Sequence, residues 1–447
     1  MVKCKHKTKN NPKNIGEGDS YLKKKAKTAI LFFISLLLLA LPVDVNAAAK
    51  LPDNYNQGNV AIDAKAAIAV DSKTGQLLYG KNINQPLPIA SMTKLVTAYL
   101  TLKAIDQEKI NWNTKVTPTR QIFAVASNRE YSNVPLRMKH TYTIRQLYQA
   151  TLIESANGAA MMLAEAISGS QVAFVKQMRQ QLQKWGIKDA RIYTTCGLPN
   201  KSVGNDAYPG AGKNDENMLS AKDMAIVGQK LIQDYPEVLK TTRIAKMDFI
   251  DQNMATPMSN FNWMLKGMPQ YHKNLKIDGL KTGTTDAAGA CFIATAPHRG
   301  GRIITVIMGA KHVTNTDPAR FIQTAKLLNY VYQKYEPLVF QRNEIIIGHT
   351  NMAVHNGQAR QINIGIKDKT LIWKPRNGSK FRVGLTSKIV EAPVEKGQKI
   401  NSYYFKIGKN KIISLQSPDG LMLSAQALES TNRVNIFVRF WRWLFGG

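Results

Sequence analysis

A serine and a lysine three residues apart, Ser91 and Lys94, have the types and spacing of a nucleophile with its base. On a helix the two side chains lie one turn apart on the same face. Met92, Leu95 and Val96 around Lys94 are apolar, so we expect the lysine to be buried. Burial disfavours the ammonium ion and lowers the pKa, which lets the amine take the hydroxyl proton. N–H groups at the start of the helix would stabilise an oxyanion. The plainer alternative is a helix-capping serine followed by a surface lysine.

A second hydroxyl, at Ser155, precedes the amide of Asn157 at the junction of two apolar segments with helical periodicity. Ser155 could relay a proton between Lys94 and a departing amine. The amide of Asn157 could hold both the lysine and the backbone of a substrate. Taken alone, this motif favours the alternative reading, which is a polar turn between two helices.

A third motif, Lys281-Thr282-Gly283, follows a turn at Asp278-Gly279 and leads into Thr284. An edge strand here would offer backbone hydrogen bonds to an extended peptide. Lys281 and Thr282 would hold an anionic terminus, and Gly283 would remove a side chain where substrate passes. The alternative is an ordinary hairpin.

Each motif also occurs by chance elsewhere in the chain. The second copies are Ser20–Lys23, Ser430–Asn432 and Lys73–Gly75. The Lys73 copy precedes Ser91 and reads as a hairpin turn. What chance rarely supplies is all three motifs in order, each in a suitable structural setting.

Together these residues resemble the three motifs of the serine D-Ala-D-Ala carboxypeptidases, the low-molecular-mass penicillin-binding proteins of bacterial cell walls. The resemblance is close from about residue 61 to residue 335 and looser beyond. The segments that carry it are Pro88–Lys94, Ser155–Ala160, Asp278–Gly283, Gly197–Pro199 and Asp317–Arg320. Two positions differ from the commoner family pattern. Ala156 occupies a position where glycine is frequent, and Thr284, directly after Lys281-Thr282-Gly283, occupies a position where histidine is frequent.

The resemblance implies a role for each candidate residue and needs no cofactor or metal. Ser91 would attack the terminal D-Ala-D-Ala bond of a peptidoglycan stem peptide and form an acyl-enzyme, with Lys94 as base. Ser155 would relay the proton to the departing D-alanine. Water would then release the shortened peptide, and penicillins would acylate Ser91 as substrate mimics.

The backbone N–H groups of Ser91 and Thr284 would form the oxyanion hole. Arg320 would hold the substrate carboxylate, and the other positioning residues would be Asn157, Lys281, Thr282, Gly283 and Thr284.

Three other classes of protein fit the sequence less well. A class A β-lactamase adds a glutamate that activates the deacylating water; the one candidate, Glu154, is expected to belong to a helix. A non-catalytic β-lactam-binding or wall-binding protein would not need the intact Ser91, Lys94, Ser155 and Lys281. A metallopeptidase is excluded because the seven histidines include no His-x-x-x-His pair.

The elements around the motifs predict a mixed α/β (α+β) catalytic domain over residues 50–336. As the family resemblance also implies, it would be an antiparallel sheet flanked by helices, like penicillin-binding proteins and β-lactamases. Apolar runs predict strands at 66–70, 76–79, 291–296 and 303–308, with hairpin turns at Lys73–Gly75 and Gly300–Gly301. Helical periodicity predicts helices over 91–103, 143–153, 159–167 and 319–335.

The rest of the chain predicts a smaller β-rich domain and an amphipathic anchor. Residues 337–428 contain three alternating runs, at 361–373, 381–390 and 402–415, which indicate an antiparallel β module. In segment 429–447 apolar side chains recur at helical spacing from residue 431, opposite Arg439 and Arg442. Such a helix is typical of a membrane interface. The alternative is that it packs on the protein's own core.

The N-terminus predicts export. Residues 1–47 combine nine lysines, an apolar run at 29–41 and a small-residue cleavage site, which indicate a secretory signal peptide. The alternative is an uncleaved anchor, for which the apolar run is short. The net charge of +31 favours a polyanionic neighbour. For an exported chain without a zinc-finger or aromatic RNA-binding pattern, that neighbour is expected at the cell wall or the outer face of the cytoplasmic membrane, and nucleic acid is not expected.

Overall fold

The computed structural model describes residues 50–314 and 316–445 of the 447-residue chain. The segment 1–47, where the sequence predicts a signal peptide, lies outside these residues, and so does the chance pair of Ser20 and Lys23.

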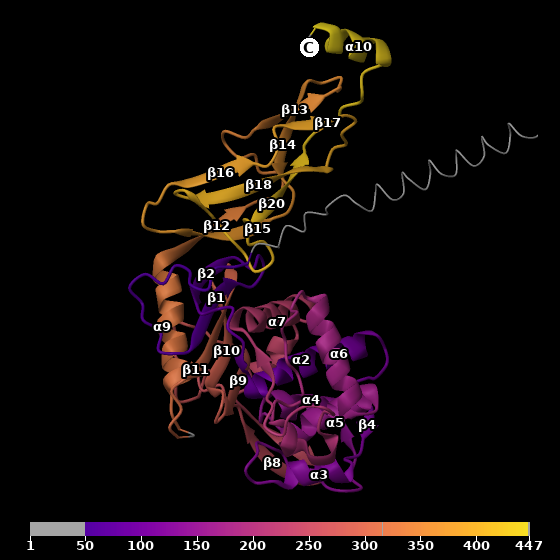
Figure 1. Ribbon diagram of the computed structural model, residues 1–447, viewed down its shortest axis with the longest axis vertical. Helices are drawn as coiled ribbons and strands as arrows, with labels where there is room; N and C mark the ends of the chain where they lie inside the picture. The colour runs from indigo at the N-terminus through magenta and orange to yellow at the C-terminus, as the bar shows by residue number, and fades with distance from the viewer. Residues whose placement is uncertain (1–49, 315, 446–447) are drawn as a thin grey trace, which may run out of the picture. The chain divides into compact units, whose positions relative to one another are not determined.

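A five-stranded antiparallel sheet carries the third motif on its edge strand. In pairing order its strands are β2 (Leu77–Lys81), β1 (Ala66–Asp71), β11 (Gly301–Ala310), β10 (Gly289–His298) and β9 (Gly279–Thr285). Both predicted hairpins are confirmed (Figure 1). The β10–β11 turn is formed by Arg299 and Gly300, with φ angles of 43° and 83°. Positive φ at both central residues matches a two-residue turn to the twist of its strands.

Both faces of this sheet are buried. Along β1, Ala66, Ile68 and Val70 join one apolar core, whereas Ala67 and Ala69 join a second, because successive strand residues point to opposite faces. Helix α9 (Ala319–Lys334) covers the second face, and α7 (Ala221–Asp234) covers the first (Figure 1). The predicted fold class, an antiparallel sheet flanked by helices, is confirmed.

The other helices of this region lie on the same side of the sheet as α7. They are α2 (Lys94–Asp106), α3 (Arg120–Ser127), α4 (Ile144–Leu152), α5 (Asn157–Ser168), α6 (Gln171–Lys184) and α8 (Val238–Thr242). The predicted cap at Thr143 is present: its side chain accepts from the backbone N–H of Gln146, whose own side chain reaches back to the Thr143 N–H. The helix expected from residue 91 starts as a 3₁₀ turn, η1 (Ala90–Thr93), and becomes α-helical at Lys94.

Short strand pairs and a second 3₁₀ turn fill the connections. The pairs are β3 (Leu87–Pro88) with β6 (Met218–Leu219), β4 (Lys115–Val116) with β5 (Tyr142–Thr143), and β7 (Lys246–Asp251) with β8 (Met254–Ser259). The 3₁₀ turn is η2 (Asn200–Asp206). The β3–β6 pair leads the chain directly into the turn that carries Ser91.

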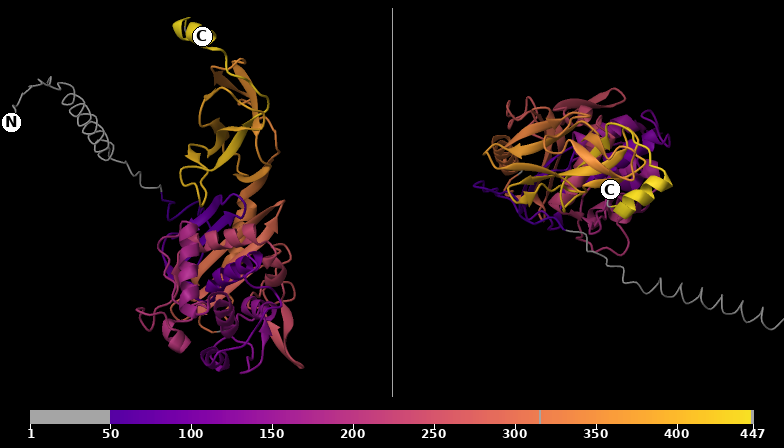
Figure 2. Two further views of the ribbon diagram at one scale, coloured as in Figure 1. Left: turned by 90° about the vertical axis from the view of Figure 1, so that its right-hand side faces the viewer. Right: turned by 90° about the horizontal axis from the view of Figure 1, so that it is seen from above.

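The predicted β-rich region is present (Figure 2). It contains the pair β12 (Tyr335–Phe340) with β15 (Thr370–Pro375), and a seven-stranded sheet. The strands of that sheet are β16 (Phe381–Leu385), β18 (Lys399–Ile407), β20 (Met422–Ala427), β14 (Gln361–Ile366), β13 (Asn351–His355), β17 (Ile389–Glu391) and β19 (Asn410–Lys411).

Two details of this region differ from the sequence-based prediction. Each of the three predicted runs is divided into two strands, because polar residues inside it redirect the chain. The sheet is also not wholly antiparallel: β13 and β17 pair in parallel, with Val354 opposite Val390. Alternation within a strand reports which face is buried, and it carries no information about the direction of the neighbouring strand.

The C-terminal helix is shorter than predicted. Thr431 pairs with Val394 in a β-bridge, and α10 runs only from Ile436 to Phe445. None of the described residues of α10 is buried, so the helix does not pack its apolar side chains on the protein's own core. Within residues 50–314 and 316–445, no single helix has the length and hydrophobicity to span a membrane, although α5 and α6 taken together meet that test across an 84° bend.

Candidate active site

A cleft of about 490 Å³ joins six of the nine predicted site residues. They are Ser91, Ser155, Thr282, Gly283, Thr284 and Arg320. The other three, Lys94, Asn157 and Lys281, are buried, with 0%, 3% and 3% of their surface exposed. The fold therefore brings together motifs that are about 60 to 190 residues apart in the chain.

Ser91 stands on a strained turn that two other segments hold in place. The preceding residue, Ala90, has a φ of 47°, which is uncommon for a residue with a Cβ. A Cβ on Gly197 would lie 2.0 Å from the Ala90 carbonyl oxygen, and one on Gly283 would lie 2.6 Å from that of Ile89. Gly283, predicted to clear a path for substrate, does line the cleft, but it also allows the backbone of the turn that carries Ser91 to approach β9 closely.

Lys94 makes three hydrogen bonds, one of which joins its amine to the Ser91 hydroxyl. Its Nζ lies 2.8 Å from Ser91 Oγ, 2.8 Å from Asn157 Oδ1 and 2.7 Å from the Cys196 carbonyl oxygen. Burial lowers the pKa of Lys94 to about 8, because the ammonium ion loses its hydration. The side chain thus sits at hydrogen-bond distance from the hydroxyl that it would deprotonate.

The second motif forms the turn between α4 and α5, as expected. Ser155 has a φ of 59°, and its side chain faces the cleft without a hydrogen bond to any other residue that the structure describes. Asn157 begins α5, and its Nδ2 donates to the Ser132 carbonyl oxygen at 3.0 Å while its Oδ1 accepts from Lys94. Asn157 therefore links Lys94 to the loop that contributes Ser132 to the cleft lining. Glu154, expected in the helix, lies in this turn and accepts from the Ser259 N–H at 2.8 Å.

The third motif lies on the edge strand β9, as predicted. Lys281 points inward, and its Nζ donates to the Thr282 carbonyl oxygen at 3.2 Å. Burial lowers the pKa of Lys281 well below its ordinary value, and the charges of Lys94 and Arg320 lower it further. The two lysines thus share one buried region in which the ammonium form of each is disfavoured.

Arg320 reaches β9 from the first turn of α9. It donates to the carbonyl oxygens of Gly283 and Cys291 at 2.9 and 3.2 Å, and to Thr284 Oγ1 at 2.7 Å. Two of these hydrogen bonds go to the edge strand β9 and the third goes to its neighbour β10. The guanidinium fixes the position of Thr284 while itself lining the cleft.

Several cleft residues carry no motif and were not found from the sequence. Tyr131 and Ser132 form one wall, Phe261 and Trp263 form another, and Glu216 accepts from Thr285 Oγ1 at 2.7 Å beside the cleft. The carbonyl of Cys196 could not be inferred either, because any residue supplies a carbonyl. Only the resemblance around Gly197–Pro199 pointed to that segment. Among the described residues no cluster of three His, Cys, Asp or Glu side chains could hold a metal ion.

Comparisons with known proteins identify the family of this chain. A family model described as D-alanyl-D-alanine carboxypeptidase matches residues 53–312. The chain is 28% identical over 403 residues to the D-alanyl-D-alanine carboxypeptidase DacF of Bacillus subtilis, covering 88% of this chain and 93% of that protein. It is 29% identical over 357 residues to DacC of Escherichia coli, covering 79% and 82%.

Solved structures of penicillin-binding proteins share the fold. A peptidoglycan synthesis regulatory factor (PBP3) from Streptococcus pneumoniae superimposes with a TM-score of 0.71 at 34% identity, over 84% of this chain and all of that chain. Penicillin binding protein 5 from Haemophilus influenzae gives a TM-score of 0.67 at 25% identity, over 84% and 99%. The matched family confirms the predicted one: this chain belongs to the D-alanyl-D-alanine carboxypeptidases, serine peptidases of family S11.

Proposed function

We propose that Ser91 is the nucleophile and Lys94 the base of a D-Ala-D-Ala carboxypeptidase that trims peptidoglycan stem peptides. The observation that carries the assignment is the 2.8 Å contact between Lys94 Nζ and Ser91 Oγ, made by a lysine with no exposed surface. With a pKa of about 8, roughly a tenth of the amine is neutral at pH 7, enough to act as a base.

In the acylation step Ser91 Oγ bonds to the carbonyl carbon of the terminal peptide bond, and its proton passes to Lys94 Nζ. The C–N bond then breaks, and the departing nitrogen of D-alanine receives that proton through the Ser155 hydroxyl. Ser155 suits this task because its hydroxyl faces the cleft and has no competing partner among the described residues. The backbone N–H groups of Ser91 and Thr284 stabilise the oxyanion. Gly283 supports this pairing by bringing β9 against the nucleophile turn.

In the deacylation step a water molecule attacks the ester carbonyl and gives one proton to Lys94. The Ser91–acyl bond breaks, Ser91 regains its proton, and the shortened peptide leaves with a new carboxylate. Asn157 keeps the amine of Lys94 oriented in both steps.

The C-terminal carboxylate of the substrate binds beside the third motif. The Thr284 hydroxyl lines the cleft and is fixed by Arg320. An anion bound beside Lys281 would stabilise the ammonium form of that lysine, which burial and the neighbouring cations otherwise disfavour. Thr282 and Gly283 lie on the edge strand β9, whose outer side is free of a strand partner in the sheet and is offered to the extended peptide.

β-Lactams acylate Ser91 in the same way, because their ring carbonyl takes the place of the scissile peptide bond. Penicillin-Binding Protein D2 from Listeria monocytogenes supports this proposal. Its cefotaxime-bound form superimposes with a TM-score of 0.51 at 30% identity, over 62% of this chain and all of that one.

The test combines two readouts on the same protein. Fluorescent penicillin should label the wild type covalently and leave Ser91→Ala unlabelled, and D-alanine release from a soluble pentapeptide should be lost in parallel. Labelling without D-alanine release would indicate a binding protein without turnover. Labelling and release by Ser91→Ala would refute the assignment.

We also propose that the chain is exported through its 1–47 segment and held at the outer face of the cytoplasmic membrane by α10. Eight apolar residues of α10 are well exposed, and Phe437 and Trp443 keep 75% and 78% of their surface in solvent. Burying such a face in the lipid interface is favourable. Deleting residues 431–447 should release the protein from anionic vesicles; unchanged binding by the shortened protein would remove this proposal.

A further inference from the structure

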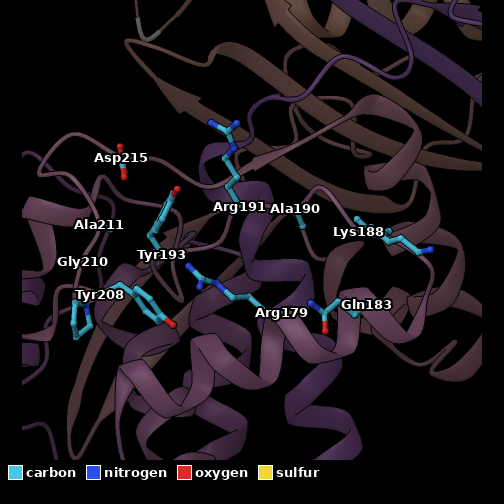
Figure 3. A pocket seen from close by; sticks show the side chains of 12 residues that line it. Arg179, Gln183, Lys188, Ala190, Arg191, Tyr193, Tyr208, Gly210, Ala211 and Asp215 are labelled. Carbon is cyan, nitrogen blue, oxygen red and sulfur yellow. The ribbon is translucent and has the colours of Figure 1, made fainter.

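A second cavity, of about 420 Å³, shares no lining residue with the cleft. It lies between α6 and the loops 187–193 and 208–215 (Figure 3). No part of the proposed reaction uses it. Its volume falls within the range of about 300–1,000 Å³ that is usual for small-molecule sites.

The core of this cavity is an arginine held between two tyrosines. The Arg179 guanidinium carbon lies 4.1 Å from the ring centre of Tyr208 and 5.5 Å from that of Tyr193. Arg179 Nε donates to the Ile192 carbonyl oxygen at 2.8 Å, and Nη2 donates to the same oxygen. Figure 3 shows the guanidinium beside the two rings. Arg179 is therefore preorganised, and its Nη1 has no acceptor among the described residues.

The lining is rich in donors and poor in acceptors. Within the described chain, the side chains of Gln183, Lys188 and Arg191 and the hydroxyls of Tyr193 and Tyr208 form no hydrogen bond. Arg191 is carried on a fixed backbone, because its N–H and carbonyl both pair with Met218. The single carboxylate of the lining, Asp215, stands at one edge and accepts from the Gly212 N–H at 2.9 Å.

We propose that this cavity binds an anionic group carried on a carbohydrate or polyol of the cell wall, as a second attachment point of the enzyme to its polymeric substrate. Three cations against one carboxylate select an anion, and a guanidinium fork pairs with carboxylate or phosphate through two hydrogen bonds. The tyrosines add flat apolar faces with hydroxyls at their ends, which suit a sugar ring. The inference rests on the proposed function, which places the enzyme on peptidoglycan.

The shared chemistry has two possible sources, a carboxylated sugar and a phosphorylated polyol. The probes are N-acetylmuramic acid, N-acetylglucosamine and glycerol 3-phosphate, titrated against the full chain by calorimetry. The first two sugars differ by the lactyl carboxylate. Each titration is repeated after penicillin has acylated the protein, so that binding in the cleft is separated from binding in the second cavity.

The test variant is Lys188→Gln with Arg191→Gln, which removes two exposed cations and leaves Arg179 in place. The matched control is Lys109→Gln with Lys184→Gln, two exposed lysines outside the cavity. We expect the test variant to weaken binding of the anionic probe roughly tenfold or more, since it loses charge-assisted contacts, and the control to change it less than twofold. The test variant should also lose activity on intact wall polymer while its D-alanine release from a soluble pentapeptide stays unchanged.

Binding of N-acetylmuramic acid but not N-acetylglucosamine supports a carboxylated sugar, and binding of glycerol 3-phosphate alone supports the phosphate source. Equal binding of both sugars, binding of no probe, or equal weakening in the test and control variants would overturn the inference. D-alanine release from the soluble peptide reports on the proposed function separately, so failure of one proposal is not confused with failure of the other.

Discussion

The carbonyl oxygen of Cys196 accepts a hydrogen bond of 2.7 Å from Lys94 Nζ. The next residue, Gly197, packs against Ala90 so closely that a Cβ would overlap the Ala90 carbonyl. One short segment therefore fixes both the proposed base and the turn that carries the proposed nucleophile. Because the acceptor is a backbone atom, the Cys196 thiol itself is not required; burial raises its pKa and keeps it neutral.

The first prediction concerns pH. The folded-state pKa of Lys94 is lowered to about 8, so the neutral amine is depleted as pH falls below that value. The rate constant for acylation by penicillin should rise about tenfold per pH unit below 8 and level off above it, because the neutral form is the base. Stopped-flow measurement of the acylation rate constant over a range of pH gives this rising part of the pH–rate profile. An acylation rate that falls as pH rises toward 8 would contradict the role of Lys94.

The second prediction is that Asn157→Asp shifts the rising part of the pH–rate profile to higher pH. A carboxylate at this position would lie beside Lys94 Nζ, where Asn157 Oδ1 now accepts at 2.8 Å. The added negative charge should stabilise the ammonium ion and raise the Lys94 pKa by at least about one unit. Acylation at pH 7 should therefore drop roughly tenfold and recover at higher pH.

The control for this variant is Asn157→Ala, which removes the same hydrogen bond without adding charge. It should slow acylation at every pH without shifting the rising part of the pH–rate profile to higher pH. Identical pH profiles for the two variants would show that Asn157 does not control the charge of Lys94.

The third prediction concerns the close approach of Gly197 to the turn that carries Ser91. Gly197→Ala combines a φ of 88° with a Cβ 2.0 Å from the Ala90 carbonyl oxygen, so the turn must move. We expect acylation to fall by two or more orders of magnitude and the melting temperature to drop. About 1–2 kcal/mol of the loss in stability is the cost of positive φ alone.

Gly186→Ala is the matched control, because its φ is 82° and nothing lies within 4 Å of the added Cβ. It should lose only the stability that positive φ costs and retain normal acylation. Equal acylation defects in the two variants would show that the close approach of Gly197 to Ala90 is unimportant.

The fourth prediction separates recognition from chemistry at Thr284. Thr284→Val removes the hydroxyl that accepts from Arg320 at 2.7 Å and leaves a buried guanidinium donor unpaired. We expect the KM for a pentapeptide to rise roughly tenfold with a smaller change in kcat, because substrate carboxylate binding is weakened. Thr284→Ser keeps the hydroxyl and should restore the KM. A defect confined to kcat in both variants would place Thr284 outside carboxylate recognition.

Local sequence patterns were sufficient for most elements of the catalytic region. The hairpins of β1–β2 and β10–β11, the capped helix α4 and the turn at Ser155 follow from apolar periodicity and turn residues, which act over a few neighbours. The same reasoning was less accurate where an element's limits depend on distant partners. It did not predict the parallel β13–β17 pair, the short α10 or the position of Glu154 outside the helix.

The sequence by itself determined which side chains carry the chemistry, because three motifs in a fixed order specify a hydroxyl, an amine and an edge strand. Only the tertiary structure decided how these groups meet. The hydrogen bond from Lys94 to the Cys196 carbonyl, the close approach of two glycines to the Ser91 turn and the attachment of Arg320 to β9 all join segments far apart in the chain. Such contacts depend on backbone carbonyl oxygens and on glycines, which have no side chain. Neither of these leaves a recognisable pattern in the sequence.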